Sequence, residues 1–229
     1  MRPPDDGAPI AVATGVTRRF VDQGETVLGL DDVSMVARAG ALTAVVGPSG
    51  SGKSTLLAQL ACTDRPSAGT VTLAGVDVTA MTGRARRRLR RTRLGIVLPQ
   101  PSDNLLDDLD AVSNLRWAAR TRGAEPLSRD DAVAQLERVG LAASSAKRVV
   151  ELSGGEQQRL AVLCAAVGDP LLVLADEPTA SLDRVTAAQL VDLLRAFAAG
   201  GTTIVVATHD PALVDASDDV VRLDHGRLA

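Results

Sequence analysis

A glycine-rich segment at residues 47–54 has the residue types needed to bind phosphate. It reads Gly47-Pro48-Ser49-Gly50-Ser51-Gly52-Lys53-Ser54 and fits the pattern G-x-x-x-x-G-K-[ST] in full. The glycines let consecutive backbone N–H groups turn toward an anion. Lys53 adds a positive charge, and the Ser54 hydroxyl suits a Mg²⁺ ion. We therefore expect the backbone of residues 49–55, through Thr55, to hold nucleotide phosphates.

Two carboxylates follow a short apolar run at residues 171–175. They are Asp176 and Glu177. In a parallel sheet that carries a phosphate loop, the carboxyl ends of the strands lie beside the phosphates. Asp176 suits the Mg²⁺ shell, through a water molecule. Glu177 is then placed to polarise an attacking water, as a general base or as an orienting group.

A second helix start suited to phosphate lies at residues 152–159, which read LSGGEQQR. Ser153, Gly154 and Gly155 open this helix, whose N-terminus attracts anions. One γ-phosphate has no evident need for two such helices from one subunit. A symmetric dimer resolves this, because the second helix of each subunit can then cap the nucleotide of its neighbour.

The LSGGEQQR segment looks like the ABC signature, and the order of motifs over about residues 10–228 resembles the ATPase subunits of ABC transporters. The resemblance implies an α/β P-loop NTPase. Its parts would be a RecA-like core with a mainly parallel sheet, an N-terminal antiparallel β subdomain and an inserted α-helical subdomain. We expect one ABC ATPase domain over residues 1–229. Residues 1–98 and 165–229 would form the core, and residues 99–164 the helical subdomain with the switch loop and the signature.

The resemblance also assigns roles to single residues. Phe20 matches the aromatic residue that stacks on adenine, and Asp183 matches the loop that communicates across the dimer. His209 matches the histidine that contacts the γ-phosphate. The implied ligands are ATP and Mg²⁺. Within the family, the chain resembles the bacterial lipoprotein-release, macrolide-export and cell-division ATPases.

The implied function is hydrolysis of ATP that powers a separate integral membrane permease through closure of a homodimer or heterodimer. One alternative is an ATPase that regulates a membrane complex without transport. Another is a weakly hydrolysing cassette paired with a different subunit. ABC proteins of DNA repair or translation are disfavoured, because their long coiled coils, zinc inserts and tandem cassettes are not present in the sequence.

The sequence departs from the family pattern at the switch loop. The family places a Gln at the end of this strand, near Mg²⁺ and the attacking water. Without a gap, Pro99 occupies that position here and Gln100 falls one residue later. The proline side chain has no hydrogen-bonding group. Either Gln100 substitutes, as a Mg²⁺ and water contact on a shifted backbone, or hydrolysis is impaired; substitution is the preferred interpretation.

Composition limits the class of partner. The formal net charge of −3 argues against a nucleic-acid binder, and Cys62 and Cys164 suggest two reduced thiols. The N-terminus has no apolar signal region, and the longest apolar run is far shorter than the about 20 residues that span a bilayer. We expect a cytoplasmic protein, peripheral on the inner face of the cell membrane, that contacts the membrane only through its partner.

An arginine-rich segment stands out in this acidic chain. Residues 84–93 read RARRRLRRTR. The segment predicts a solvated amphipathic helix with Leu89 facing inward. Two other interpretations are a contact to the permease or to anionic lipid headgroups, and a nucleic-acid site, which the lack of interleaved aromatic residues disfavours.

Apolar periodicity predicts the remaining elements. Strands are expected at residues 10–13, 33–36, 42–46, 70–73, 76–78, 95–98, 171–175, 203–207 and 220–223. Helices are expected after Lys53, over most of residues 105–165 and at residues 184–199. Residues 1–9 are expected to be loose, with a glycine-containing turn region between the first two strands. Strands linked by helices indicate a largely parallel sheet.

Overall fold

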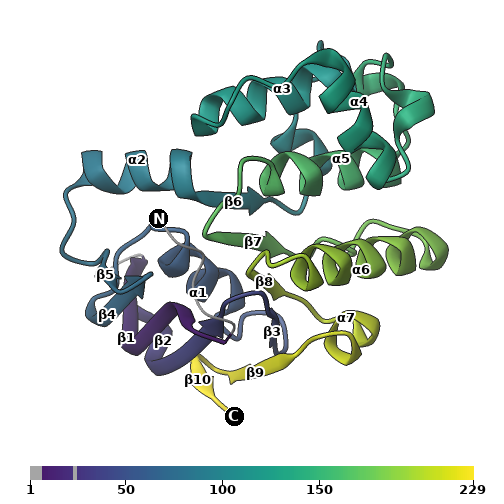
Figure 1. Ribbon diagram of the computed structural model, residues 1–229. Helices are drawn as coiled ribbons and strands as arrows, with labels where there is room; N and C mark the ends of the chain where they lie inside the picture. The colour runs from purple at the N-terminus through teal and green to yellow at the C-terminus, as the bar shows by residue number, and fades with distance from the viewer. Residues whose placement is uncertain (1–6, 23–24) are drawn as a thin grey trace.

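The computed structural model describes residues 7–22 and 25–229. Two sheets organise the chain (Figure 1). The first is antiparallel, with strand order β2-β1-β4-β5. Its strands are β1 (Pro9–Asp22), β2 (Glu25–Arg38), β4 (Ala68–Leu73) and β5 (Val76–Asp77). This sheet covers α1 (Lys53–Leu60), the helix that follows the glycine loop.

The second sheet has six strands in the order β10-β9-β3-β8-β7-β6, and all neighbours are parallel except β10 and β9. Its strands are β3 (Leu42–Val46), β6 (Leu94–Val97), β7 (Leu172–Asp176), β8 (Ile204–Ala207), β9 (Asp219–Asp224) and β10 (Arg227–Leu228). The fold is thus a mixed α/β arrangement with a mainly parallel sheet beside an antiparallel one.

Both faces of the parallel sheet are buried, which explains the continuous apolar runs. In β7, Leu172 and Leu174 enter the core shared with α1 and the antiparallel sheet. Val173 and Ala175 enter the other core, which is built mainly with helices. The period of two along a strand divides one run between two cores.

Helices make up most of the chain between β6 and β7. Figure 1 shows α3, α4 and α5 gathered at one end of the molecule, away from the antiparallel sheet. The helices besides α1 are α2 (Gly83–Arg93), α3 (Ala111–Arg122), α4 (Arg129–Arg138), α5 (Gly154–Ala166), α6 (Arg184–Ala199) and α7 (Pro211–Asp215). Short 3-10 helices are η1 (Pro101–Asn104), η2 (Ala142–Ser144) and η3 (Val149–Glu151).

The first two strands were predicted far too short. The expected turn region between residues 13 and 33 is wrong, because β1 runs to Asp22, β2 begins at Glu25, and the two strands pair along their length. Gly15 and Asp32 have positive φ values (59° and 55°), and the register shifts several times along the pair. Such bulges interrupt the alternation that marks a strand. Of the segment expected to be loose, residues 1–6 lie outside the described part and Pro9 already begins β1.

Cys62 and Cys164 are both buried, and neither forms a disulfide in the structure. Burial raises the pKa of the Cys164 thiol to about 12 and that of Cys62 above its usual value. Among residues 7–22 and 25–229, no helix combines the length and the hydropathy needed to cross a membrane.

Candidate nucleotide site

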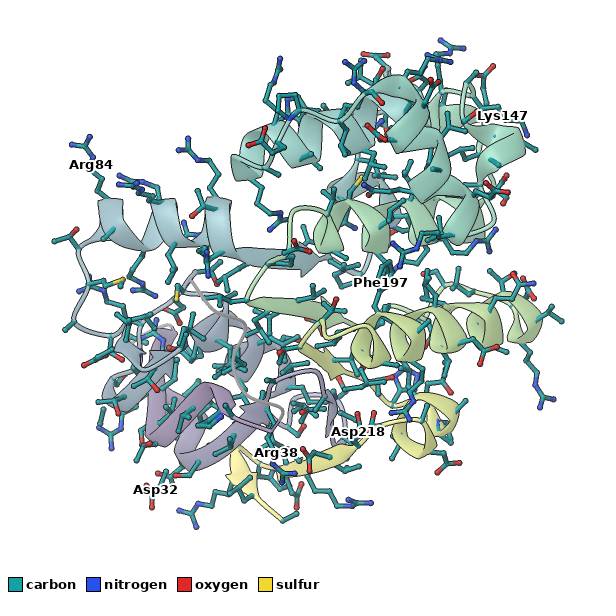
Figure 2. All side chains as sticks on the ribbon, in the orientation of Figure 1. Asp32, Arg38, Arg84, Lys147, Phe197 and Asp218 are labelled. Atoms are coloured by element: carbon teal, nitrogen blue, oxygen red, sulfur yellow. The ribbon has the colours of Figure 1, made fainter. Side chains whose placement is uncertain are left out.

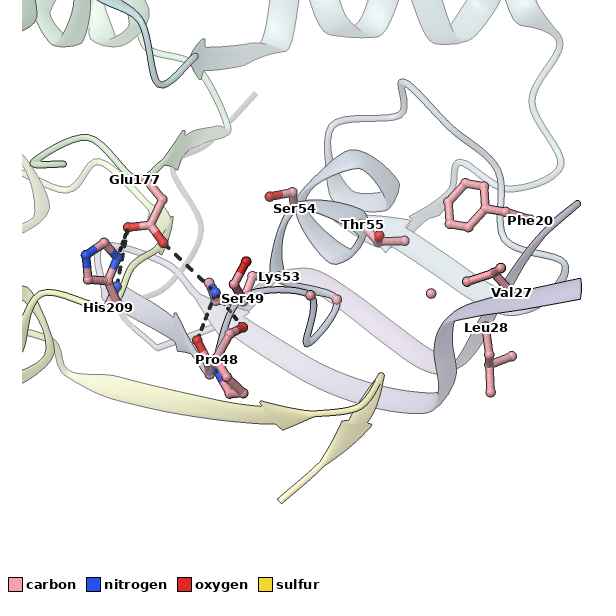
Figure 3. A pocket seen from close by; sticks show the side chains of 14 residues that line it. Phe20, Val27, Leu28, Pro48, Ser49, Lys53, Ser54, Thr55, Glu177 and His209 are labelled. Atoms are coloured by element: carbon pink, nitrogen blue, oxygen red, sulfur yellow. Dashed lines mark hydrogen bonds and ion pairs between the residues drawn. The ribbon is translucent and has the colours of Figure 1, made fainter. Parts of the chain in front are cut away.

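An open pocket of about 740 Å³ lies where the glycine loop meets the carboxyl ends of β7 and β8 (Figure 3). One end of the pocket is apolar and contains Phe20, and the other end is polar and contains Lys53 and Glu177. Its lining residues are Phe20, Val27, Leu28, Gly29, Gly47, Pro48, Ser49, Gly50, Gly52, Lys53, Ser54, Thr55, Glu177 and His209. The pocket therefore brings together ten of the predicted site residues from segments far apart in the sequence.

The glycine loop connects β3 to α1, as strand, loop and helix. Gly52 has a φ of 102°, and a Cβ there would lie 2.5 Å from the Gly29 carbonyl oxygen, so only glycine fits. Gly52 is also the N-cap of α1, and as a glycine it has no side chain that could accept a hydrogen bond from the first turn. The first N–H groups of α1 are thus left for an anion in the pocket.

Lys53 is buried, and its ammonium group faces the loop. Its Nζ donates hydrogen bonds to the carbonyl oxygens of Gly47 (2.8 Å) and Pro48 (3.1 Å). The same Nζ lies 4.0 Å from Glu177 Oε1. A positive charge therefore sits between the glycine loop and the carboxylate that was predicted to act on water.

Glu177 and His209 meet although 32 residues separate them. Parallel pairing of β7 and β8 places Asp176 opposite Ala207, so the residues after both strands emerge together. Glu177 Oε2 lies 2.8 Å from His209 Nδ1 and accepts a hydrogen bond from the His209 backbone N–H (3.3 Å). Glu177 has a φ of 46°, which turns the chain sharply after β7. The carboxylate can thus accept a proton from, or orient, a water molecule in the pocket.

Asp176 and Ser54 have the chemistry that Mg²⁺ prefers. Asp176 Oδ1 is buried and has no hydrogen-bond partner within the described part of the chain. An unpartnered buried carboxylate oxygen is costly unless a cation or water meets it. Ser54 lines the pocket with an exposed hydroxyl. These oxygen donors fit a Mg²⁺ ion that takes few protein ligands beside phosphate oxygens and water.

Phe20 lies at the apolar end of the pocket, with 36% of the residue exposed. The guanidinium of Arg18 sits 4.4 Å from the centre of its ring, a cation–π distance. Val27, Leu28 and Gly29 of β2 complete this end. A Cβ on Gly29 would lie 2.6 Å from Phe20 Cε2, so the glycine makes room for the ring.

The sequence analysis did not predict that Arg18, or Val27, Leu28 and Gly29 of β2, would belong to the site. The one usable signal was Gly29, because a glycine inside a strand often marks a close approach. The short strand predicted at residues 33–36 concealed it, since residue 29 then lay in the supposed turn region.

Seven predicted residues do not line this pocket. Asp176 and Ser51 lie directly beside lining residues, and the Ser51 side chain is buried. The other five lie on separate elements and are Gln100, Ser153, Gly154, Gly155 and Asp183.

The signature segment forms a tightly capped helix start. Ser153 Oγ accepts from the Glu156 N–H (3.3 Å), and Glu156 Oε2 accepts from the Ser153 N–H (2.9 Å), a capping box. Ser144 Oγ donates to Glu156 Oε1 (2.5 Å). Hydrogen bonds from Ser144 and Ser153 lower the pKa of the Glu156 carboxyl to about 2. Ser153 and Gly154 remain exposed, so the N-terminus of α5 faces outward.

The signature also touches the loop that contains Asp183. A Cβ on Gly155 would collide with Cγ2 of Thr186, which lies in the first turn of α6. Asp183 is the N-cap of α6 and accepts from the N–H groups of Val185 and Thr186. Thr186 Oγ1 donates to Asp183 Oδ2 (2.6 Å), and these bonds lower the pKa of the Asp183 carboxyl. The two predicted dimer elements are therefore packed as one unit.

A glycine loop with a buried lysine, beside acidic residues at the end of a parallel strand, defines a P-loop NTPase. The ABC transporter family model matches residues 30–180. The chain belongs to this family and is an ABC ATPase cassette.

Relatives and solved structures agree with this family assignment. The chain is 40% identical to the lipoprotein-releasing system ATP-binding protein LolD of Chromohalobacter salexigens, over 94% of this chain and 91% of that protein. It is 37% identical to the macrolide export ATP-binding/permease protein MacB of Burkholderia pseudomallei, over 96% of this chain. It spans only 34% of the MacB relative's length. The dimeric, post-hydrolysis ATP-binding cassette MJ0796, bound to ADP and Pi, has a TM-score of 0.85 at 29% identity, with 96% of both chains covered.

Proposed function

We propose that the chain hydrolyses ATP in a dimer with two shared sites and thereby drives a separate membrane permease from the inner face of the cell membrane. The observation that carries the proposal is the position of Glu177 and His209, in contact with each other, at the phosphate end of a pocket that also holds Lys53. The relatives named for ATP binding and for permease function support the coupling to a membrane partner.

Each part of the pocket has a role in this proposal. The triphosphate occupies the glycine loop, where Lys53 exchanges its bonds to the loop carbonyls for phosphate oxygens. Adenine stacks on Phe20, whose other neighbour is the Arg18 guanidinium. Glu177 orients the attacking water and accepts its proton, while His209 contacts the γ-phosphate and steadies the carboxylate.

Asp176, Ser54 and Gln100 would hold Mg²⁺ in the loaded enzyme. The ion supplies charge neutralisation for the phosphate oxygens. The buried, unpartnered Oδ1 of Asp176 is the structural observation that supports this assignment.

The helical segment between β6 and β7 is the part that we assign to the permease contact. It exposes Leu106 (37%) and Trp117 (44%), close in sequence to the exposed Leu98 (42%) of the switch loop. A hollow of about 290 Å³ beside Trp117 is lined by Leu109, Ser113, Arg116, Arg120, Pro126 and Leu127. Exposed apolar surface around a hollow is typical of a protein interaction site.

A weakly hydrolysing cassette in a heterodimer is the second candidate. The observation that favours it is the switch loop, in which Pro99 occupies the expected glutamine position and Gln100 does not line the pocket.

The test is steady-state ATP hydrolysis by the purified chain over a range of protein concentrations. We expect turnover per chain to rise with concentration. Glu177→Gln should lower it about 10²–10⁴-fold, the usual contribution of a general base. Glu137→Gln, an exposed position on α4, is the matched control and should leave it unchanged. A chain that never bound Mg-ATP, alone or with its permease, would refute the proposal, whereas binding with negligible turnover would favour the second candidate.

A further inference from the structure

Helix α2 carries seven arginines in eleven residues and no acidic residue. Two of the arginines fasten it to the core. Arg86 is buried and donates to the Asp64 carbonyl oxygen, and Arg90 donates to the Cys62 carbonyl oxygen. Leu89 packs against the core on the same side, as predicted. These contacts fix which side of α2 faces outward.

Four other arginines form an outer row, which comprises Arg84, Arg87, Arg88 and Arg91. Their spacing of i, i+3, i+4 and i+7 places them on one face of the helix, and all four are exposed. In Figure 2 the labelled Arg84 side chain points away from the body of the molecule. The row lines a surface hollow of about 830 Å³ together with Arg90 and Ile96.

The outer row lacks counter-charges within the protein. Among the described residues, no carboxylate lies within 4.0 Å of any of the four guanidinium groups, although the chain has 28 acidic residues. Like charges at these helical spacings destabilise a helix. The net charge of the chain is −3, so the row is a local cluster of positive charge on a chain that is negative overall.

We propose that the outer row binds the anionic phosphate groups of membrane lipids, so that α2 rests on the bilayer surface. Arginine suits this role because its planar guanidinium forms paired hydrogen bonds to phosphate oxygens. The inference rests on the proposed function, because that function places the chain beside a membrane. It replaces the expectation that the chain contacts the membrane only through a partner with a direct contact made by α2.

The composition of the row favours a lipid surface over other anionic partners. Helix α2 places no large apolar side chain among the four arginines, and Ile96 of β6 is the single apolar residue that lines their hollow. The centre of a protein interface, by contrast, is depleted of charge and enriched in aromatic residues. No aromatic residue on α2 can stack on a base, which disfavours single-stranded nucleic acid. The lipids of a bilayer are mobile, so their phosphates can neutralise the charges of the four arginines without a surface of complementary shape.

The test is co-sedimentation of the full chain with vesicles at low ionic strength. One set contains phosphatidylcholine alone, and in the other phosphatidylglycerol replaces part of it. We expect binding to the anionic vesicles only, and its loss in high salt. Substitution of Gln for all four outer arginines should weaken binding about fivefold for each one, so on the order of several-hundred-fold together. A variant with Gln at four exposed cations elsewhere, Arg129, Arg138, Lys147 and Arg222, is the charge-matched control and should still bind.

Each outcome is decisive. Equal binding to both vesicle types, or equal loss in the two variants, would overturn the inference, because a specific row would then be unnecessary. Tighter binding of a short RNA or DNA than of anionic vesicles would also overturn it, in favour of a nucleic-acid site. ATP turnover without vesicles is measured on the same preparations. If the wild-type chain shows no ATP turnover, the proposed function fails. If it turns over ATP but does not bind anionic vesicles, only the inference about α2 fails.

Discussion

Gln100 carries the only side-chain amide in the switch segment Leu98-Pro99-Gln100-Pro101. Asn104 holds this segment, because its side chain bonds to the backbone N–H and C=O of Leu98 and to the C=O of Gln100. If Gln100 replaces the expected glutamine, Gln100→Ala should lower ATP turnover about tenfold or more, as loss of a positioned polar group does. Pro99→Gln should then change turnover less than about threefold, since the amide is already supplied.

Steady-state turnover at saturating Mg-ATP is the measurement for both variants, with ATP affinity measured in parallel. Gln135→Ala, on α4, is the control for loss of an amide outside the switch segment. A rise of an order of magnitude in Pro99→Gln would contradict the prediction and show that the native loop lacks a working amide.

The Glu156 carboxylate links folding stability to pH. Its folded pKa of about 2 lies below its ordinary value of 4.5, so the fold favours the charged form. The stabilisation is complete above about pH 4.5 and is lost as the pH falls through about 2. Glu156→Gln should cost about 1–2 kcal/mol at neutral pH, a figure reduced for partial solvent exposure.

The measurement is denaturant unfolding of wild type and Glu156→Gln across pH. The difference in unfolding free energy should shrink as the pH falls below 4.5. Glu137→Gln replaces an exposed glutamate whose side chain forms no hydrogen bond or ion pair with any residue that the structure describes, and it should show little difference. A difference that stays constant with pH would assign the effect to shape or hydration and not to the charge of Glu156.

At the scale of elements, Gly155 sets the distance between α5 and α6. Gly155→Ala forces its methyl group against Thr186 Cγ2 and should cost about 1–3 kcal/mol, as overpacking does. Gly154→Ala is the matched control one residue earlier, where a Cβ meets nothing within 4 Å, and its effect should stay within about 0.5 kcal/mol. Thermal or denaturant unfolding measures both.

A second substitution distinguishes the clash from a change in helix propensity. Thr186→Ser removes Cγ2 and keeps the hydroxyl that donates to Asp183. The double variant Gly155→Ala with Thr186→Ser should recover most of the lost stability. Failure of this rescue would place the cost of Gly155→Ala elsewhere.

The elements differ in how far the sequence predicts them. Strand β3 and helix α6 occupy the predicted residues, because an apolar run buried on both faces and a helix capped by Asp183 are local signals. The β1–β2 hairpin was not predictable in the same way, since bulges near Gly15 and Asp32 break its alternation.

The same distinction holds for the site. The glycine loop is contiguous and was predicted whole. The contact between Glu177 and His209 depends on the pairing of β7 with β8, and the apolar end depends on how β2 crosses the loop through Gly29. Such relations between distant segments leave no periodic pattern in the sequence. The family resemblance supplied His209 and Phe20, but it did not supply Arg18 and Gly29, which contact Phe20.

At the scale of the whole molecule, the two phosphate-seeking helix starts belong to different parts of the chain. The N-terminus of α1 opens into the pocket, whereas Ser153 and Gly154 at the start of α5 are exposed and do not line it. A single chain therefore does not bring both to one nucleotide. The dimeric state of the similar cassette MJ0796 supports the proposal that a second copy supplies the missing half.

This arrangement predicts that a bulky cation at Ser153 blocks dimerisation and leaves nucleotide binding intact. In a Glu177→Gln background, where ATP persists, we expect ATP to convert monomers to dimers in sedimentation velocity. Adding Ser153→Arg should weaken the dimer about tenfold or more, because the side chain would occupy the space that the proposed dimer gives to the partner's nucleotide, and because it removes the cap of α5. ATP affinity of the monomer should not change, since Ser153 does not line the pocket of its own chain. Ala134→Arg adds the same side chain to an exposed site on α4 and should dimerise normally. If the Ser153 and Ala134 variants dimerised equally well, the exposed start of α5 would not be part of the interface.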